Sequence, residues 1–167
     1  MKLNLYGMVN DSIVDGPGLR FSVFVQGCPH NCPGCQNPES HAFGAGTDTE
    51  IDEILKRIQG NPLLDGVTFS GGEPFGQAEG LAALGKQVKA LGLNIVTFTG
   101  YTFEHLYARK DENPGWADLL EVTDYLIDGP FVEELRSLEL RFRGSSNQRI
   151  IDVQKSLAAG KAIEAAL

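Results

Sequence analysis

Three cysteines, Cys28, Cys32 and Cys35, lie within eight positions of the segment "GCPHNCPGCQNP" (27–38), and the chain has no others. Their C-x3-C-x2-C spacing suits metal binding, because an odd number of clustered thiols does not pair into a disulfide framework. Three thiolates can bind zinc or hold an iron–sulfur cluster. The spacing therefore indicates a metal centre and leaves one question open, which is what fills the fourth coordination position.

Three metal centres fit this spacing. His30 or His41 could complete a Cys3His zinc site, although His30 lies between two cysteines on a short loop and has little freedom to reach the same ion. Three thiolates can instead bind three irons of a [4Fe-4S] cube, whose fourth iron then accepts a small chelating molecule. An electron-transfer cluster ligated wholly by protein is the third choice. The spacing favours the open cluster over the other two.

A second motif, "SGGEP" (70–74), follows an apolar run directly. It can be a glycine turn at the end of a strand, with Pro74 in the first turn of a helix. Its glycines can also let the main chain approach a ligand without a Cβ in the way. Glu73 would then offer a carboxylate or a carbonyl to an ammonium group. The order of the two motifs along the chain favours the binding role.

Alternating strands and helices should position these motifs. Helical spacing of apolar residues, with Gly60 and Gly92 after the last of them, predicts helices. Aromatic and β-branched runs predict strands. The expected helices are 47–60 and one containing Leu81 to Leu91, and the expected strands are 20–26, 65–70, 94–99 and 123–129. We also expect a mobile connection over 109–119, in which Trp116 anchors the loop, and a helical tail over 156–167.

This alternation predicts an α/β fold with right-handed crossovers and a mainly parallel sheet. Ligands of such sheets lie beyond the carboxyl ends of the strands, so the loops with the cysteines, "GGEP", "TGYT" (99–102) and "DGPF" (128–131) should converge. A complete (β/α)8 barrel takes roughly 250 residues. We therefore expect residues 1–167 to form one domain, a partial (β/α) barrel with an open side.

Composition limits the function classes. The formal net charge of −8 disfavours a nucleic-acid partner, which needs a basic patch. The first twelve residues lack the apolar core of a signal peptide, and no apolar run is long enough for a membrane span. We expect a cytoplasmic protein, where thiols stay reduced, without nucleic-acid or membrane partners.

Together the motifs resemble those of the radical S-adenosylmethionine superfamily, whose C-x3-C-x2-C loop holds a [4Fe-4S] cluster. Narrower segments, "DGPGLR" (15–20), "CPHNCPGCQNP", "DYLIDGPF" (124–131) and "RGSSNQRI" (143–150), are similar to those of glycyl-radical-enzyme activases, and in particular of the anaerobic ribonucleoside-triphosphate reductase activating proteins. One departure is Gly34, since the superfamily usually has an aromatic residue before the third cysteine. The resemblance extends over almost the whole chain.

The resemblance implies a chemistry and a set of site residues. An external one-electron reductant such as flavodoxin reduces the cluster, S-adenosylmethionine is cleaved, and the 5′-deoxyadenosyl radical takes a hydrogen atom from a glycine of the partner, anaerobic ribonucleoside-triphosphate reductase. No side chain beyond cluster and cofactor is expected to be catalytic. The implied cluster ligands are Cys28, Cys32 and Cys35, and the implied cofactor contacts are Gly34, Cys35, Gln36, Gly71, Gly72, Glu73 and Asp128.

Two other functions stay open from the sequence. The nearest is activation of another glycyl radical enzyme such as pyruvate formate-lyase, and the more distant is a zinc-stabilised binding module without catalysis. Asp15 can belong to a simple turn or contact the substrate. Tyr101 fits a half-buried ring, His41 and His105 fit ordinary surface or helix positions, and the segment 143–149 can be a solvated loop or hold a partner or a cofactor carboxylate.

Overall fold

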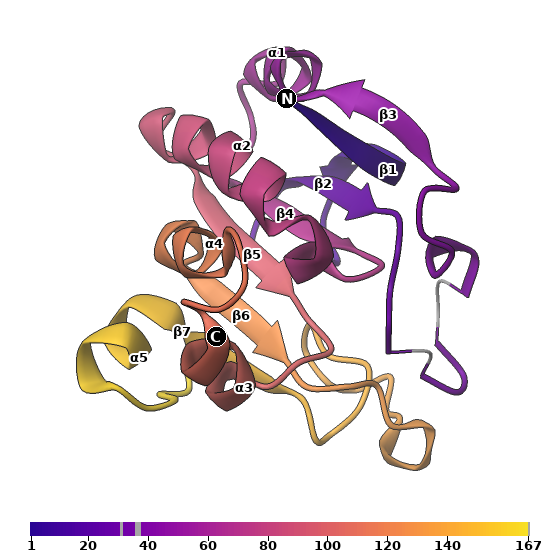
Figure 1. The fold of residues 1–167 in the computed structure, drawn as a ribbon, viewed down its shortest axis with the longest axis vertical. Coiled ribbons are helices and arrows are strands. Elements are labelled where there is room, and N and C mark those ends of the chain that lie inside the picture. Colours follow the sequence, from indigo (N-terminus) through magenta and orange to yellow (C-terminus); the bar gives the residue numbers. More distant parts are fainter. Residues whose placement is uncertain (31, 36–37, 167) are drawn as a thin grey trace.

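The computed structural model describes residues 1–30, 32–35 and 38–166, and seven strands form one sheet in the order β3-β1-β2-β4-β5-β6-β7 (Figure 1). The strands are β1 (Lys2–Ser12), β2 (Arg20–Val25), β3 (Thr47–Glu50), β4 (Gly66–Gly71), β5 (Asn94–Phe98), β6 (Tyr125–Asp128) and β7 (Arg149–Asp152). Because β3 and β7 lie at opposite ends of this order, the sheet is open.

The centre of the sheet is parallel and its two flanks are antiparallel. The strands β2, β4, β5 and β6 pair parallel, whereas β1 pairs antiparallel with β2 and β3, and β7 pairs antiparallel with β6. The predicted α/β fold with mainly parallel strands is therefore confirmed for the core. The arrows of the parallel strands in Figure 1 point toward the side of the molecule where the cysteine loop lies.

In the described part of the chain, five α-helices connect or follow these strands. They are α1 (Ile51–Gln59), α2 (Ala78–Ala90), α3 (Phe103–Arg109), α4 (Trp116–Val122) and α5 (Val153–Ala159). Parallel neighbours follow one another in a single direction from β2 to β6, so right-handed crossovers put their helices on one face. Figure 1 shows α1, α2 and α4 along that face, where α2 packs against both α1 and α4.

Side chains alternate between the two faces of the sheet. Phe21 and Val23 of β2, like Val67 and Phe69 of β4, belong to the large core beneath the helices. On the opposite face, Val96 forms a smaller apolar cluster with neighbours from β6 and β7. The helix-free face is thus partly apolar and, at β2 and β4, polar.

Arg20 is the largest polar group buried on the helix-free face. Its guanidinium donates to Thr68 Oγ1 (2.7 Å) and to the carbonyl oxygens of Pro17 (2.8 Å), Val67 (2.9 Å) and Asn94 (3.3 Å). Burial lowers the pKa of Arg20 to about 10. These bonds join the "DGPG" turn to β4 and β5, so the turn is fixed against the sheet.

Three expectations about the elements are wrong in part. Residues 47–50 form β3 rather than the start of a helix, since they pair with β1. The segment 109–119 contains the start of α4, and Trp116 is buried there, donating from Nε1 to the Phe75 carbonyl (2.9 Å). The helical tail ends at Ala159, because Gly160 adopts a left-handed conformation and the chain then bridges from Glu164 to Ile151.

Within the described residues, no helix has both the length and the apolar character needed to cross a membrane.

Candidate functional site

The loops that follow β2 and β4 are joined through their main chains. Gly72 N donates to the Val25 carbonyl (2.8 Å), and Glu73 N donates to the Gly27 carbonyl (2.8 Å). A Cβ on Gly72 would lie 2.3 Å from that Gly27 oxygen, closer than real Cβ contacts allow. The second glycine of "SGGEP" is therefore needed so that the loop can lie directly against the cysteine segment.

A cavity of about 360 Å³ opens where these loops meet. Its walls include all three cysteines, Gly71 and Gly72. Predicted residues from two distant motifs therefore face one volume at the carboxyl ends of parallel strands, the usual ligand position in such folds. Other walls come from Val14 and Asp15 on one side and from the segment 131–148 on the other.

The three thiols fit a cluster ligand set. Cys28, Cys32 and Cys35 are each partly exposed, and none forms a disulfide. In the described part of the chain, no group of three or more His, Cys, Asp or Glu side chains is placed to hold one metal ion. A [4Fe-4S] cube offers a separate iron to each thiolate, so its ligands need to face one volume rather than one point.

Glu73 is buried, with 1% of its surface exposed, and its carboxylate accepts hydrogen bonds from three segments. Its donors are His30 Nε2 of the cysteine loop (2.6 Å), Gly100 N (2.8 Å), Thr99 Oγ1 (2.9 Å to both oxygens) and Phe75 N (3.0 Å). These donors compensate the cost of burying the charge. The side chain is committed to protein donors, and Glu73 does not line the cavity. Its main chain also bonds within the protein, since its N–H donates to the Gly27 carbonyl and its carbonyl accepts from Gly76 N (2.9 Å).

His30 and Tyr101 pack edge to face beside this carboxylate, with ring centroids 4.5 Å apart. Tyr101 also stacks on His105 at 4.9 Å. The pKa of Tyr101 is raised, chiefly by burial and further by electrostatic interaction with Glu73 and Cys28. Tyr101 is half-buried and does not line the cavity. Its ring therefore packs between neighbouring side chains, as the sequence suggested.

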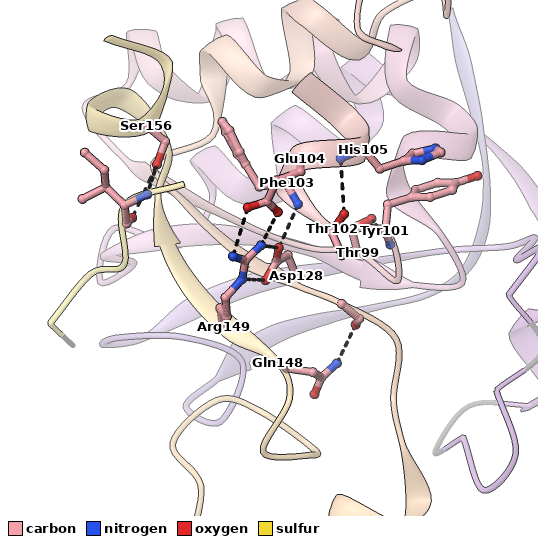
Figure 2. A network of polar contacts seen from close by, with 12 residues as sticks. Thr99, Tyr101, Thr102, Phe103, Glu104, His105, Asp128, Gln148, Arg149 and Ser156 are labelled. Carbon is pink, nitrogen blue, oxygen red and sulfur yellow. Dashed lines mark hydrogen bonds and ion pairs between the residues drawn. The ribbon is translucent and has the colours of Figure 1, made fainter. Parts of the chain in front are cut away.

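Asp128 ends β6 and is almost fully buried. Its carboxylate accepts from Phe103 N (2.8 Å) and from Arg149, whose Nη2 is 2.5 Å away and whose Nε is 3.1 Å away. Figure 2 shows Arg149 between Asp128 and Glu104, which also binds it (2.6 Å). These carboxylates raise the pKa of Arg149, which in turn lowers the pKa of Glu104. Asp128 thus holds the start of α3 and does not line the cavity.

Gln148 organises the cavity wall that follows β6. Its amide donates to the Gly129 carbonyl (3.0 Å), as Figure 2 also shows, and its oxygen accepts from Gly144 N (2.9 Å) and Ser145 N (3.2 Å). On the opposite wall, Asp15 Oδ2 accepts from Ser12 Oγ (2.6 Å) and Ser22 Oγ (3.0 Å). Both walls are therefore fixed to the sheet by side chains.

The structure brings some predicted site residues together and places others elsewhere. The cysteines, Gly71 and Gly72 share the cavity, while Gly34 lies against the carboxylate of Glu133 outside its wall. Gln36 lies outside the described residues. His41, for which the sequence offered an ordinary surface or helix position or a place in a zinc site, lines the cavity. Its position six residues beyond Cys35 was the available signal.

Comparisons with known proteins agree with this site. Residues 14–151 match the family described as "4Fe-4S single cluster domain". The anaerobic ribonucleoside-triphosphate reductase-activating protein of Escherichia coli K12 is 33% identical over 81% of this chain and 90% of its own length. The pyruvate formate-lyase-activating enzyme of Clostridium pasteurianum is 36% identical over 59% of this chain but 44% of its own length.

One solved structure, that of QueE from Escherichia coli, is similar to 61% of this chain and 54% of its own, with a TM-score of 0.49 and 18% sequence identity.

Gly100→Ala tests the contact between His30 and the "TGYT" loop. A Cβ there would lie 2.4 Å from the His30 ring, so we expect the cysteine loop to be displaced and the iron content after anaerobic reconstitution to fall at least severalfold. Gly76→Ala is the matched control, because its nearest neighbour would be 4.0 Å away. Equal iron content in both variants would contradict this contact.

Arg149→Met leaves the buried Asp128 carboxylate without its charged partner. We expect the free energy of unfolding to fall by about 3 kcal/mol in urea denaturation. Glu104→Gln removes only the exposed partner and should cost less than about 1 kcal/mol. Equal losses in the two variants would mean that burial of Asp128 does not govern this network.

The Glu104–Arg149 pair also predicts a pH dependence. Arg149 lowers the pKa of Glu104 below its unfolded-state value of about 4.5. The pair therefore stabilises the fold above that pH, and the stabilisation is lost as the pH falls through the lower folded-state pKa. The stability difference between wild type and Glu104→Gln should therefore shrink from pH 7 to pH 3. A difference that grows on acidification would contradict the assignment.

Proposed function

Because this chain belongs to the radical S-adenosylmethionine proteins of the 4Fe-4S single cluster domain family, and within it to the anaerobic ribonucleoside-triphosphate reductase-activating proteins, we propose that it activates an anaerobic ribonucleoside-triphosphate reductase. It is a radical S-adenosylmethionine enzyme whose cofactors are a [4Fe-4S] cluster and S-adenosylmethionine. The observation that carries the proposal is the shared opening of all three cysteines onto one cavity with Gly71 and Gly72.

When bound, the cluster and S-adenosylmethionine would supply the one-electron radical chemistry that takes a hydrogen atom from a glycine of the reductase. In our proposal Cys28, Cys32 and Cys35 ligate the cluster. The main chain at Gly71 and Gly72 receives the ammonium group of the cofactor, together with the second lone pair of the Glu73 carbonyl, whose first accepts from Gly76 N. We also propose cofactor contacts at Gly34, Cys35, Gln36 and Asp128. The Asp128 contact would have to use its main chain, because its carboxylate is bound by Phe103 N and Arg149.

The form of the cavity supports a protein substrate. Its walls come from the 14–15 turn and the 131–148 segment, on the face of the open sheet opposite the α-helices of the described residues. Val14 of one wall is 72% exposed, and Leu138 of the other segment is 93% exposed. A polypeptide loop carrying the target glycine can enter between such walls, whereas a closed barrel would hinder it.

The proposal also names an external one-electron reductant, such as flavodoxin, because reductive cleavage of S-adenosylmethionine consumes one electron. It includes a cytoplasmic location, since thiolate ligands require a compartment that keeps cysteine reduced.

Activation of a pyruvate formate-lyase is the second candidate. It is favoured by the 36% identity to the Clostridium pasteurianum activating enzyme, but that similarity covers 44% of the enzyme's length, against 90% for the Escherichia coli reductase-activating protein. The two candidates differ in the partner and share the cofactor chemistry.

The test combines anaerobically reconstituted, reduced protein and S-adenosylmethionine with each candidate partner and records the glycyl radical by electron paramagnetic resonance. We expect a signal with the anaerobic reductase, and none from Cys32→Ala, which should also fail to bind four irons. A signal with pyruvate formate-lyase alone would overturn the partner. A colourless protein with one zinc would overturn the enzyme assignment.

A further inference from the structure

His41 lies against one of the proposed cluster ligands. Its Nε2 is 3.4 Å from Cys35 Sγ, within the range for a hydrogen bond to sulfur, and both residues line the cavity. The sequence suggests an ordinary surface position for this histidine. Its contact with a ligand sulfur points instead to a role in the metal centre.

The main chain fixes His41 in this position. Cys28 N donates to the His41 carbonyl (3.1 Å), and His41 N donates to the Pro38 carbonyl (3.3 Å). The buried side chain of Gln26 donates to the carbonyls of Glu39 (2.9 Å) and Ala42 (2.8 Å), on either side of the histidine. His41 therefore contacts two cysteines. Its backbone carbonyl accepts from Cys28 N, and its ring lies against Cys35 Sγ.

The other histidine of the cysteine loop is committed elsewhere. His30 uses Nε2 to donate to the buried Glu73 carboxylate at 2.6 Å. His41 Nε2 instead contacts a cysteine sulfur, Cys35 Sγ, at 3.4 Å. A thiolate bound to iron has no proton to give, so Nε2–H of His41 must be the donor and Cys35 Sγ the acceptor.

From this geometry we infer that His41 sets the reduction potential of the cluster by hydrogen bonding to the Cys35 sulfur. Reduction adds one electron from the external donor, with no bond made or broken, and increases the negative charge on the cluster and its sulfurs. An N–H donor stabilises the more negative state, so His41 raises the potential and eases reduction. This inference rests on the proposed function, because it requires a cluster on Cys35.

The test is a potentiometric titration of the reconstituted cluster, followed by the electron paramagnetic resonance signal of its reduced form. His41→Phe keeps a flat ring and removes the donor. At the wild-type midpoint we expect its ratio of reduced to oxidised cluster to fall about tenfold, which is 59 mV for a one-electron couple. His41→Gln keeps an N–H donor of similar reach, so its reduction potential should stay close to that of the wild type.

Two further variants keep the outcome decisive. His41→Asn is polar but too short to reach the sulfur, so its potential should fall as in His41→Phe. His105→Phe replaces an imidazole that stacks on Tyr101 and does not line the cavity, and it should leave the potential unchanged.

Each outcome has a separate meaning. A wild-type potential in a four-iron His41→Phe or His41→Asn protein would overturn the inference and leave the proposed function intact. Loss of the cluster in both variants, with retention in His41→Gln, would mean that His41 serves assembly and would also overturn it. Failure of the wild-type chain to bind a cluster would instead overturn the proposed function.

Discussion

The buried carboxylate of Glu73 is the constraint on which the arrangement of the site depends. It accepts hydrogen bonds from the cysteine loop through His30, from the loop after β5 through Thr99 and Gly100, and from its own loop through Phe75. A buried carboxylate that lost these donors would be costly, so the three loops must stay together around it. The cavity and its three thiols are positioned as a consequence.

Two neighbouring loops are also held by charged side chains. Arg20 holds the turn that carries Asp15, and Arg149 with Asp128 holds the start of α3 after the "TGYT" loop. In an acidic chain, two buried or half-buried arginines are thus used to fix loops rather than to meet an external anion. The open cavity between the walls is left to the cofactor and to the target loop of the partner.

The local sequence pattern predicted the strands of the parallel core. Runs such as 65–70 and 94–99 are largely apolar because they are buried on both faces of the sheet, so their composition alone indicates a strand. The flanking strands β1, β3 and β7 could not be found in this way, since their strand character comes from pairing with β2, β1 and β6. Residues 47–50 show this directly, because their polar sequence fits a helix start equally well.

The site was predictable to the extent that its chemistry is local. The cysteine spacing indicated a metal centre and the glycines of "SGGEP" a close approach of the main chain to a ligand. Both motifs do line the cavity. The roles of Glu73 and Asp128 were not predictable from local pattern, because their hydrogen-bond donors lie on other strands and loops. The contact of His41 with Cys35 was not predictable for the same reason, because it depends on the turn held by Gln26.

The link between the Glu73 carboxylate and the cysteine loop is tested most directly by hydrogen exchange in Glu73→Gln and wild-type protein, both without cofactors. The amide replaces an acceptor oxygen by a donor that faces other donors. Exchange should therefore accelerate together in the cysteine loop and in residues 99–103, while the pairing of β1 with β2 keeps its protection. Unchanged exchange in those two loops would contradict the idea that one buried carboxylate holds the site together.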